Sequence, residues 1–447
     1  MRRAMSESVP EVPMASRKVH RECPEENNPL NVDLNAPPID PRIDKIVNDL
    51  TNPKHRDRVP GVAVVVRKDN KIVHLNCYGY ANLETGAKTR LDTVFDLGSL
   101  SKQFTAVAVL NLVINNKLYL TDHLSKFFKG FPRYADSITV EDLIHHTSAL
   151  PDYSAIFVES RRAEKGWYEK AMATGNDWYP QMPIGKKEIT NKDVLKWIAT
   201  QTLLPRPPDT EFEYCNSGYV VLAELVARVT KKRLGEYLKE VLFDGLGMEA
   251  TYVFDETSRF SADAREIVNH ARCYNRMSGH FVPVGYTPLN FITGDGNFHS
   301  TIVDLAKWER NLHELEFNPV RELLWTPVKV KSRKKQNYGA GWQLLNDKYK
   351  DEVEVKGRLV TRKYERRAEY HRGIWLGWRS FIARASRWPV PEAGKTIDPK
   401  TMESLGIVVL SNAIFDHEQF TTCHIAQEIS RLYWKKDNIM NKFNCAS

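Results

Sequence analysis

Ser99 and Lys102 are the pair of side chains in this sequence best placed to do chemistry. They stand three residues apart, so in a helix they lie on one face, about one turn from each other. Lys102 is the only charged residue between Asp96 and Lys117, and the run Gln103–Asn115 is otherwise almost wholly apolar. Because a helix that is apolar on nearly every side lies inside a protein, we expect this lysine to be buried.

Burial gives this pair a chemical role. A lysine removed from water loses the hydration of its ammonium group, which favours the neutral amine that can accept a proton. A hydroxyl beside such an amine becomes an activated nucleophile. Gly98 permits a tight entry into the helix, whose N-terminal N–H groups can stabilise an oxyanion. The alternative is that Ser99 only caps the helix while Lys102 reaches solvent.

A second segment, Tyr214-Cys215-Asn216, stands on a loop that leads into an apolar helix over 219–230. A tyrosine and an asparagine two residues apart on such a loop can face one cavity, the first as a proton carrier and the second as an amide clamp. Tyr80-Ala81-Asn82 fits the same pattern, so the tripeptide is a weak signal by itself.

A third segment, His371-Arg372-Gly373, begins a late strand that we expect to run from Ile374 to Ala383. Glycine there would let a substrate approach the strand backbone, and the N–H of Ile374 is a candidate oxyanion donor. A lone histidine is more often a structural polar residue than a catalytic one.

Together these segments resemble the motifs of the serine β-lactamase and penicillin-binding protein superfamily. The motifs are Phe-Asp-Leu-Gly-Ser-Leu-Ser-Lys at 95–102, Tyr-Cys-Asn at 214–216 and His-Arg-Gly at 371–373. Tyr-x-Asn and His-x-Gly, in place of Ser-Asp-Asn and Lys-Thr-Gly, are similar to the class C β-lactamase, D-aminopeptidase and family VIII esterase branch. Residues 138–153 and 294–301 also resemble that branch, and the resemblance covers roughly residues 40–435.

The resemblance implies roles for the first two motifs. Ser99 would be the acylated nucleophile and Lys102 the base that activates it. Tyr214 would carry the proton to the leaving group and help to activate water. Asn216 would hold Lys102 and the acyl amide of the substrate.

The resemblance also implies that the third motif binds substrate. His371 and Gly373 would line the strand, and the N–H groups of Ser99 and Ile374 would form the oxyanion hole. Arg372 replaces a residue that is small in this branch, so it either crowds the cleft or pairs with a substrate carboxylate. Histidine in place of lysine at 371 removes a fixed charge that would otherwise recognise a β-lactam carboxylate.

Two further differences from the motifs of the branch affect the expected substrate more than the expected reaction. Ala149 and Asp295 stand where glycine is frequent in the branch.

The rest of the chain predicts how the motifs are positioned. Helical spacing over 40–50 and a strand hairpin over 62–75 come first, and helical patterns dominate from 99 to about 312. Short strands return from 353 to 410, and a closing helix spans about 416–434. We predict an α/β (α+β) fold of two domains, in which an antiparallel sheet is flanked by the terminal helices. A mainly helical domain is inserted, and the resemblance implies a β-lactamase/transpeptidase-like arrangement.

The predicted boundaries follow from these patterns. Residues 1–38 are rich in Pro, Glu and Asn, and we predict that this segment is disordered. Residues 39–95 and 330–436 form the discontinuous sheet domain, and 96–329 the inserted helical domain. The active site is expected at their interface.

Composition restricts the setting. The chain has 447 residues, of which 42% are hydrophobic and 27% charged, as in ordinary globular proteins. Its longest apolar run, within 104–114, is shorter than the ~20 residues of a membrane span. No secretory signal is visible behind the first residues, so we expect a cytoplasmic protein. Six scattered cysteines without a CxxC pair predict reduced thiols and neither a disulfide framework nor a zinc site.

The net charge of +8 comes largely from basic residues within 329–335 and 358–367. No nucleic-acid recognition pattern accompanies them, so we expect no nucleic-acid partner. We interpret these basic residues as the solvent-exposed face of a hairpin. The alternative is a basic rim, beside the cleft, that attracts an anionic substrate.

We therefore expect a serine hydrolase that acts through an acyl-Ser99 intermediate on a small-molecule ester, with an amide or a β-lactam as the less favoured substrate. A lysine–tyrosine pair supplies the acid–base chemistry, so no metal or organic cofactor is expected. Two alternatives remain open at this point. The first is an acyltransferase that uses the same acyl-enzyme, and the second is a catalytically inactive relative that acts as a scaffold or binding protein. The oligomeric state is left open.

Overall fold

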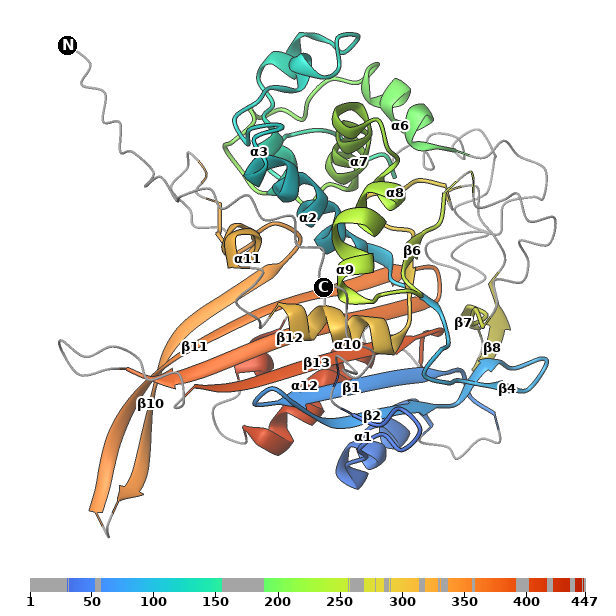
Figure 1. Ribbon diagram of the computed structural model, residues 1–447, viewed down its shortest axis with the longest axis vertical. Helices are drawn as coiled ribbons and strands as arrows, with labels where there is room; N and C mark the ends of the chain where they lie inside the picture. The colour runs from blue at the N-terminus through green and yellow to red at the C-terminus, as the bar shows by residue number, and fades with distance from the viewer. Residues whose placement is uncertain are drawn as a thin grey trace.

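The computed structural model (Figure 1) assigns each motif to an element of the fold. For residues 277, 318, 319, 321, 349–355 and 358–362 it describes the backbone alone. The described residues are 30, 32–52, 58–154, 189–255, 257, 269–277, 279–284, 289, 291–312, 318–328, 330, 337–355, 358–390, 402–415, 421–434, 439–443 and 445.

A six-stranded antiparallel sheet is built from the two ends of the chain, as predicted (Figure 1). Its strand order is β10-β11-β12-β13-β1-β2. The strands span Gln343–Val355 (β10), Arg358–Trp375 (β11), Trp378–Pro389 (β12), Glu403–Ser411 (β13), Val62–Lys68 (β1) and Lys71–Tyr78 (β2).

Both faces of this sheet are covered, which explains the uninterrupted apolar run of β1. Side chains alternate along a strand, so Val62, Val64 and Val66 enter one core while Ala63 and Val65 enter the other. On the first face lie α1 (Pro41–Thr51) and α12 (Thr421–Tyr433), and on the second lies α10 (Ile302–Asn311) (Figure 1). Thus α10, which falls in the predicted helical insertion, packs on the sheet.

The helical region surrounds α2 (Ser101–Ile114), which carries the first motif. Every residue from Thr93 to Leu110 except Ser99 is buried, which confirms the prediction of an interior helix. Its neighbours include α7 (Asn216–Thr230), α8 (Leu234–Leu238) and α11 (Asn318–Leu324). The remaining helices are α3 (Val140–Ile144), α6 (Asn191–Ile198), α9 (Asp244–Leu246), a π-helical segment at Lys239–Phe243, and short 3-10 turns at Gly98–Leu100, Leu124–Lys126, Arg133–Asp136 and Ile439–Lys442.

Short strands interrupt the helical region. A small sheet in the order β5-β9-β6 joins Phe95–Asp96, Phe298–Ser300 and Tyr252–Val253. The pairing of β5 with β9 brings the segment around residue 295 beside the first motif. The other short strands are β3 (Tyr80–Asn82), β4 (Ala87–Lys88), β7 (Tyr274–Met277) and β8 (His280–Pro283).

The prediction of one strand over Ile374–Ala383 is wrong. The chain reverses at Leu376 and Gly377, and Trp375 at the end of β11 pairs with Trp378 at the start of β12. Leu376 has a φ of +50°, a left-handed conformation that few side chains favour. The apolar run through this turn concealed it, because both flanking strands are largely buried.

The prediction of reduced thiols is wrong for one pair of cysteines. Cys423 of α12 and Cys445 form a disulfide, with Cα atoms 5.7 Å apart. The turn at Ile439–Lys442 folds back onto α12, where the Gln427 side chain donates to the carbonyl of Met440. A separation of 22 residues gives no local signal for such a pair. Cys77, Cys215 and Cys273 are free thiols.

Other predictions fall partly outside the described residues, namely the segment 1–38 and the basic residues 329–335. Within the first, Leu30 is buried in the core and Pro38 accepts a hydrogen bond from the N–H of Leu75. In the long hairpin of β10 and β11, which extends past the other strands (Figure 1), Arg366 pairs with Asp347 at 2.7 Å. No described helix is long and apolar enough to cross a lipid bilayer.

Candidate active site

A tight turn presents Ser99 at the entrance of α2. Gly98 has a φ of +51°, and a β-carbon there would lie 2.8 Å from the backbone nitrogen of Ile374. Glycine is therefore required, both for the turn and for its close approach to β11. The Asp96 carboxylate accepts a hydrogen bond from the Gly98 N–H at 2.8 Å. The turn is thus fixed while the Ser99 side chain remains partly exposed.

Gly373 is needed for packing, which differs from the reason expected from the sequence. A β-carbon at this position would lie 1.9 Å from the carbonyl oxygen of Leu97 and 2.1 Å from Ser380 Oγ. Ser380 on β12 also donates a hydrogen bond to that carbonyl at 2.6 Å. The nucleophile turn therefore rests directly on β11 and β12, and this contact fixes the position of Ser99.

Two histidines extend a polar network behind the turn. His299 Nε2 lies 3.8 Å from Asp96 Oδ2, and His299 Nδ1 lies 2.8 Å from His270 Nε2. Burial raises the pKa of Asp96 to about 7 and lowers the pKa of His270 to about 4. Among the described residues, no group of three or more His, Cys, Asp or Glu side chains is arranged to hold a metal ion.

Lys102 is fully buried, and its ammonium nitrogen contacts three oxygens. The Nζ atom lies 3.0 Å from Ser99 Oγ, 2.8 Å from Asn216 Oδ1 and 2.8 Å from the carbonyl oxygen of Asp295. The three partners come from the nucleophile turn, from the start of α7 and from the loop before β9.

This set of partners suits both protonation states of the lysine. A charged ammonium has three N–H donors, one for each oxygen. A neutral amine has two N–H donors and one lone pair. Those donors match Asn216 Oδ1 and the Asp295 carbonyl, which can only accept, and the lone pair can then accept from the Ser99 hydroxyl. A proton can therefore pass from Ser99 to Lys102 without rearrangement of the neighbours.

Tyr214 lies over the same lysine. Its ring centroid is 4.9 Å from Lys102 Nζ, its side chain is 36% exposed, and within the described part of the chain its hydroxyl forms no hydrogen bond. The His146 ring packs against the Tyr214 ring, with centroids 4.4 Å apart, and His146 Nδ1 accepts from the N–H of Cys215 at 3.1 Å. His146 therefore positions Tyr214, while the hydroxyl stays accessible.

Asn216 occupies the first turn of α7. Asp152 Oδ2 accepts a hydrogen bond from the Asn216 N–H at 2.6 Å and so satisfies a free donor at the helix start. Ser217 Oγ accepts from the Tyr153 N–H at 2.8 Å and donates to the carbonyl of Pro151 at 2.8 Å. The loop 151–153 is thus bound to the start of α7. The Asn216 Nδ2 group has no partner among the described residues, so it can donate to a ligand.

The third motif contributes mainly through its backbone. His371 is buried; Nδ1 donates to the carbonyl of Arg372 at 2.8 Å, and Nε2 accepts from the hydroxyl of Tyr338 at 3.1 Å. Burial, followed by the charge of Lys102, lowers the pKa of His371 to about 3, so this ring is neutral. Burial also lowers the pKa of Arg372. The Ile374 side chain is 38% exposed beside the nucleophile turn.

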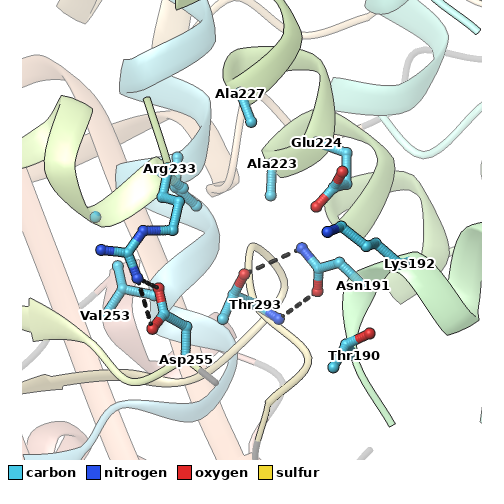
Figure 2. Close-up of a pocket in the computed structure, with 12 residues that line it drawn as sticks. Thr190, Asn191, Lys192, Ala223, Glu224, Ala227, Arg233, Val253, Asp255 and Thr293 are labelled. Carbon is cyan, nitrogen blue, oxygen red and sulfur yellow. Dashed lines mark hydrogen bonds and ion pairs between the residues drawn. The ribbon is translucent and has the colours of Figure 1, made fainter. Parts of the chain in front are cut away.

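The segment 293–295 is also held by side chains of α6 and α2. Figure 2 shows the Asn191 amide facing Thr293, whose N–H donates to Asn191 Oδ1 at 2.8 Å. Asn191 Nδ2 donates in return to Thr293 Oγ1 at 3.1 Å. The Thr105 hydroxyl of α2 donates to the carbonyl of Gly294 at 2.7 Å. These bonds fix the Asp295 carbonyl against Lys102, a contact that sequence reasoning missed although the replacement of a usual glycine marked this position.

Replacing Gly373 by alanine should separate the nucleophile turn from β11. The added methyl group overlaps the Leu97 carbonyl, so we expect a loss of stability of about 1–3 kcal/mol together with weaker reaction of Ser99. Thermal unfolding and the rate of Ser99 acylation measure the two effects. Gly130→Ala is the matched control, because a β-carbon there meets nothing within 4 Å. Equal behaviour of the two variants would contradict the packing role.

Comparisons with known proteins identify the family of this chain. The family model described as Beta-lactamase matches residues 43–426. The chain is 25% identical over 331 residues to penicillin-binding protein 4* of Bacillus subtilis (strain 168), across 72% of this chain and 64% of that protein. It is 27% identical over 266 residues to a D-aminopeptidase of Brucella anthropi, across 58% of this chain and 44% of that protein. The matched parts span less than two thirds of either relative.

Solved structures share the fold. An octameric penicillin-binding protein homologue from Pyrococcus abyssi superposes with a TM-score of 0.64 at 22% identity, over 89% of this chain and 78% of that one. A class C beta-lactamase superposes with a TM-score of 0.58 at 18% identity, over 86% of this chain and 96% of that one. The family model matches this chain over most of the chain's length, and the sheet and the central helix α2 agree with that match. This chain therefore belongs to the beta-lactamase family.

Proposed function

We propose that this protein is a serine hydrolase that forms an acyl-enzyme on Ser99, and that its substrate is an ester. The observation that supports this most directly is the contact of Lys102 Nζ with Ser99 Oγ at 3.0 Å, inside a set of oxygens that accommodates both protonation states of the lysine. A serine beside a buried amine is the arrangement that activates a hydroxyl for attack on a carbonyl.

In the first step Ser99 Oγ attacks the carbonyl carbon of the ester, and its proton moves to the neutral amine of Lys102. The N–H groups of Ser99 and Ile374 stabilise the oxyanion, in keeping with the close approach of the nucleophile turn to β11. The intermediate then collapses: the bond from carbon to the leaving oxygen breaks, and that oxygen takes the proton back from Lys102 through the Tyr214 hydroxyl. The acyl group stays on Ser99.

The second step reverses these roles with water. The oxygen of a water molecule attacks the acyl carbon, and a water proton passes through Tyr214 to Lys102. The bond between the carbon and Ser99 Oγ breaks, and Ser99 recovers its proton from Lys102. The Asn216 Nδ2 group, without a partner among the described residues, would hold an oxygen of the acyl part.

The third motif favours particular substrates. The His371 ring is neutral and both of its nitrogens have internal partners, so His371 supports the site through Tyr338 and the backbone of β11. A substrate carboxylate would instead be bound by Arg372, which lies on β11 two residues before the exposed Ile374.

The location of these residues supports an active site between the two predicted domains. Ser99, Lys102 and Tyr214 fall within 96–329, whereas Arg372 and Ile374 fall within 330–436. The boundaries themselves remain part of the proposal.

A fluorophosphonate should label the wild-type protein once, on Ser99. The probe reacts with activated serine hydroxyls, and intact and peptide mass spectrometry locate the adduct. Ser99→Ala should give no adduct and no ester hydrolysis. An unlabelled wild type, or equal turnover by Ser99→Ala, would exclude the proposed hydrolase and leave a binding role.

Replacing Lys102 by alanine should slow acylation of Ser99 by about 10²-fold or more, because general-base catalysis contributes that much. The second-order rate of labelling by the fluorophosphonate measures the loss. Lys307→Ala is a suitable control: Lys307 is also a partly buried lysine, but it binds Asp304 in α10, away from Ser99. An unchanged rate in Lys102→Ala would transfer the base role to Tyr214.

Arg372→Ala should weaken hydrolysis of esters that carry a carboxylate, by about tenfold in kcat/KM, since a hydrogen bond to a charged group is worth about 1.5–3 kcal/mol. Matched neutral esters, with a primary amide in place of the carboxylate, should be unaffected. Arg372→Lys should retain part of the activity on the anionic ester. An equal loss for both ester types would remove the carboxylate-binding role.

A further inference from the structure

We propose that Tyr153 is a positioning residue for Lys102. Its two hydrogen bonds hold two oxygen partners of Lys102, those of Asn216 and Asp295, at a fixed distance from each other. Tyr153 acts through Lys102, because its own hydroxyl is bonded to Asp295 and not to Ser99. The inference rests on the proposed function of Ser99 and Lys102, and it adds a residue that lies outside the three motifs.

Tyr153 joins the two segments that supply these oxygens. The residue is only 6% exposed. Its N–H donates to Ser217 Oγ at 2.8 Å, and its hydroxyl donates to Asp295 Oδ2 at 2.8 Å. Ser217 follows Asn216 in α7, so Tyr153 connects the start of α7 to the loop before β9. Each of these segments also binds Lys102 Nζ at 2.8 Å, through Asn216 Oδ1 and the Asp295 carbonyl.

The α7 end of this connection is fixed by three hydrogen bonds. Besides accepting from the Tyr153 N–H, Ser217 Oγ donates to the carbonyl of Pro151 at 2.8 Å. Asp152 Oδ2 accepts from the N–H of Asn216 at 2.6 Å. The loop and the start of α7 therefore form one unit, which determines where the Tyr153 hydroxyl lies.

The other end of the connection is the buried carboxyl group of Asp295. Its Oδ2 atom accepts from Tyr153, whereas its Oδ1 atom has no hydrogen-bond partner among the described residues. Because a buried polar group without a partner is costly, the carboxyl group is held where the Tyr153 hydroxyl reaches it. The carbonyl on the same residue then stays beside Lys102. A glycine at 295, which is frequent in related sequences, could not form this connection.

The spacing of the two acceptors directs the lysine toward Ser99. Two N–H donors of Lys102 are bound by Asn216 Oδ1 and the Asp295 carbonyl, so the remaining position on Nζ faces Ser99 Oγ at 3.0 Å. If the acceptors moved apart, Nζ could not stay bonded to both and remain aligned with Oγ. Misplacement of reacting groups by about 1 Å lowers rates by up to about 10²-fold.

Tyr153→Phe removes the hydroxyl and keeps the ring. We expect the second-order rate of Ser99 labelling by a fluorophosphonate to fall about tenfold, because the connection to Asp295 is lost. The probe makes the experiment independent of the natural substrate.

Tyr237→Phe is the matched control for this loss. Tyr237 is 8% exposed, and its hydroxyl donates to Asn111 Oδ1 at 2.7 Å near the end of α2. This variant also loses one buried tyrosine hydroxyl but should keep the labelling rate of the wild type. Thermal unfolding of Tyr153→Phe and Tyr237→Phe compares their loss of stability.

Two variants of Asp295 test the same connection from its other end. Asp295→Ala removes the acceptor and should slow labelling about as much as Tyr153→Phe, so it decides the matter should Tyr153→Phe not fold. Asp295→Asn should lose less than Asp295→Ala, because the amide oxygen can still accept from the Tyr153 hydroxyl.

A double variant tests whether Tyr153 acts through the lysine. In a Lys102→Ala background there is no amine left to position, so adding Tyr153→Phe should change the labelling rate by less than about twofold. A tyrosine with a merely structural role would lower the rate by the same factor in both backgrounds.

The outcomes separate the positioning role from the proposed function. A labelled wild type would leave the hydrolase intact. The positioning role would then be overturned by an unchanged rate in Tyr153→Phe, by an equal loss in Tyr237→Phe, by an equal loss in the two Asp295 variants, or by a loss that persists without Lys102. A wild type that is never labelled on Ser99 would instead overturn the proposed function.

Discussion

The contact of one buried ammonium group with three oxygens is the constraint on which the rest of this site depends. Lys102 is fully buried, and within the described part of the chain its Nζ atom is bonded to Ser99 Oγ, Asn216 Oδ1 and the Asp295 carbonyl. These oxygens are far apart in the sequence, and each must lie within about 3 Å of one atom. Loss of any one would leave a buried charged donor unpaired, at a cost of several kcal/mol. The fold must therefore fix three separate segments around one side chain.

Each of those segments is held by its own polar contacts. The nucleophile turn rests on β11 and β12, where Gly373 and Ser380 leave room for the Leu97 carbonyl and bind it. The start of α7 is capped by Asp152. The loop before β9 is bound to α2 and to α6, with the Asn191 amide as the clamp seen in Figure 2. Because these supports come from different elements, the position of Lys102 and its three partners depends on how those elements pack together.

The sequence predicted the parts of this arrangement that are local. The apolar run after Lys102 indicated an interior helix, and the three motifs were sufficient to indicate the family and the architecture. Contacts between distant segments could not be predicted in the same way. Nothing near Cys423 signals its bond to Cys445, and the uninterrupted apolar pattern concealed the reversal at Leu376. The sequence marked Asp295 only as a departure from glycine, because the carbonyl contact that gives the position its importance comes from the main chain of a loop.

Positions 295 and 371 both lie beside the Ser99–Lys102 pair, but neither side chain binds Lys102. The His371 ring is neutral and is bonded to Tyr338, so it supplies no cation that could bind a substrate carboxylate. Asp295 binds Lys102 through its main-chain carbonyl, while its carboxyl group accepts a hydrogen bond from Tyr153. In the proposed hydrolase, recognition of a substrate anion would therefore depend on Arg372.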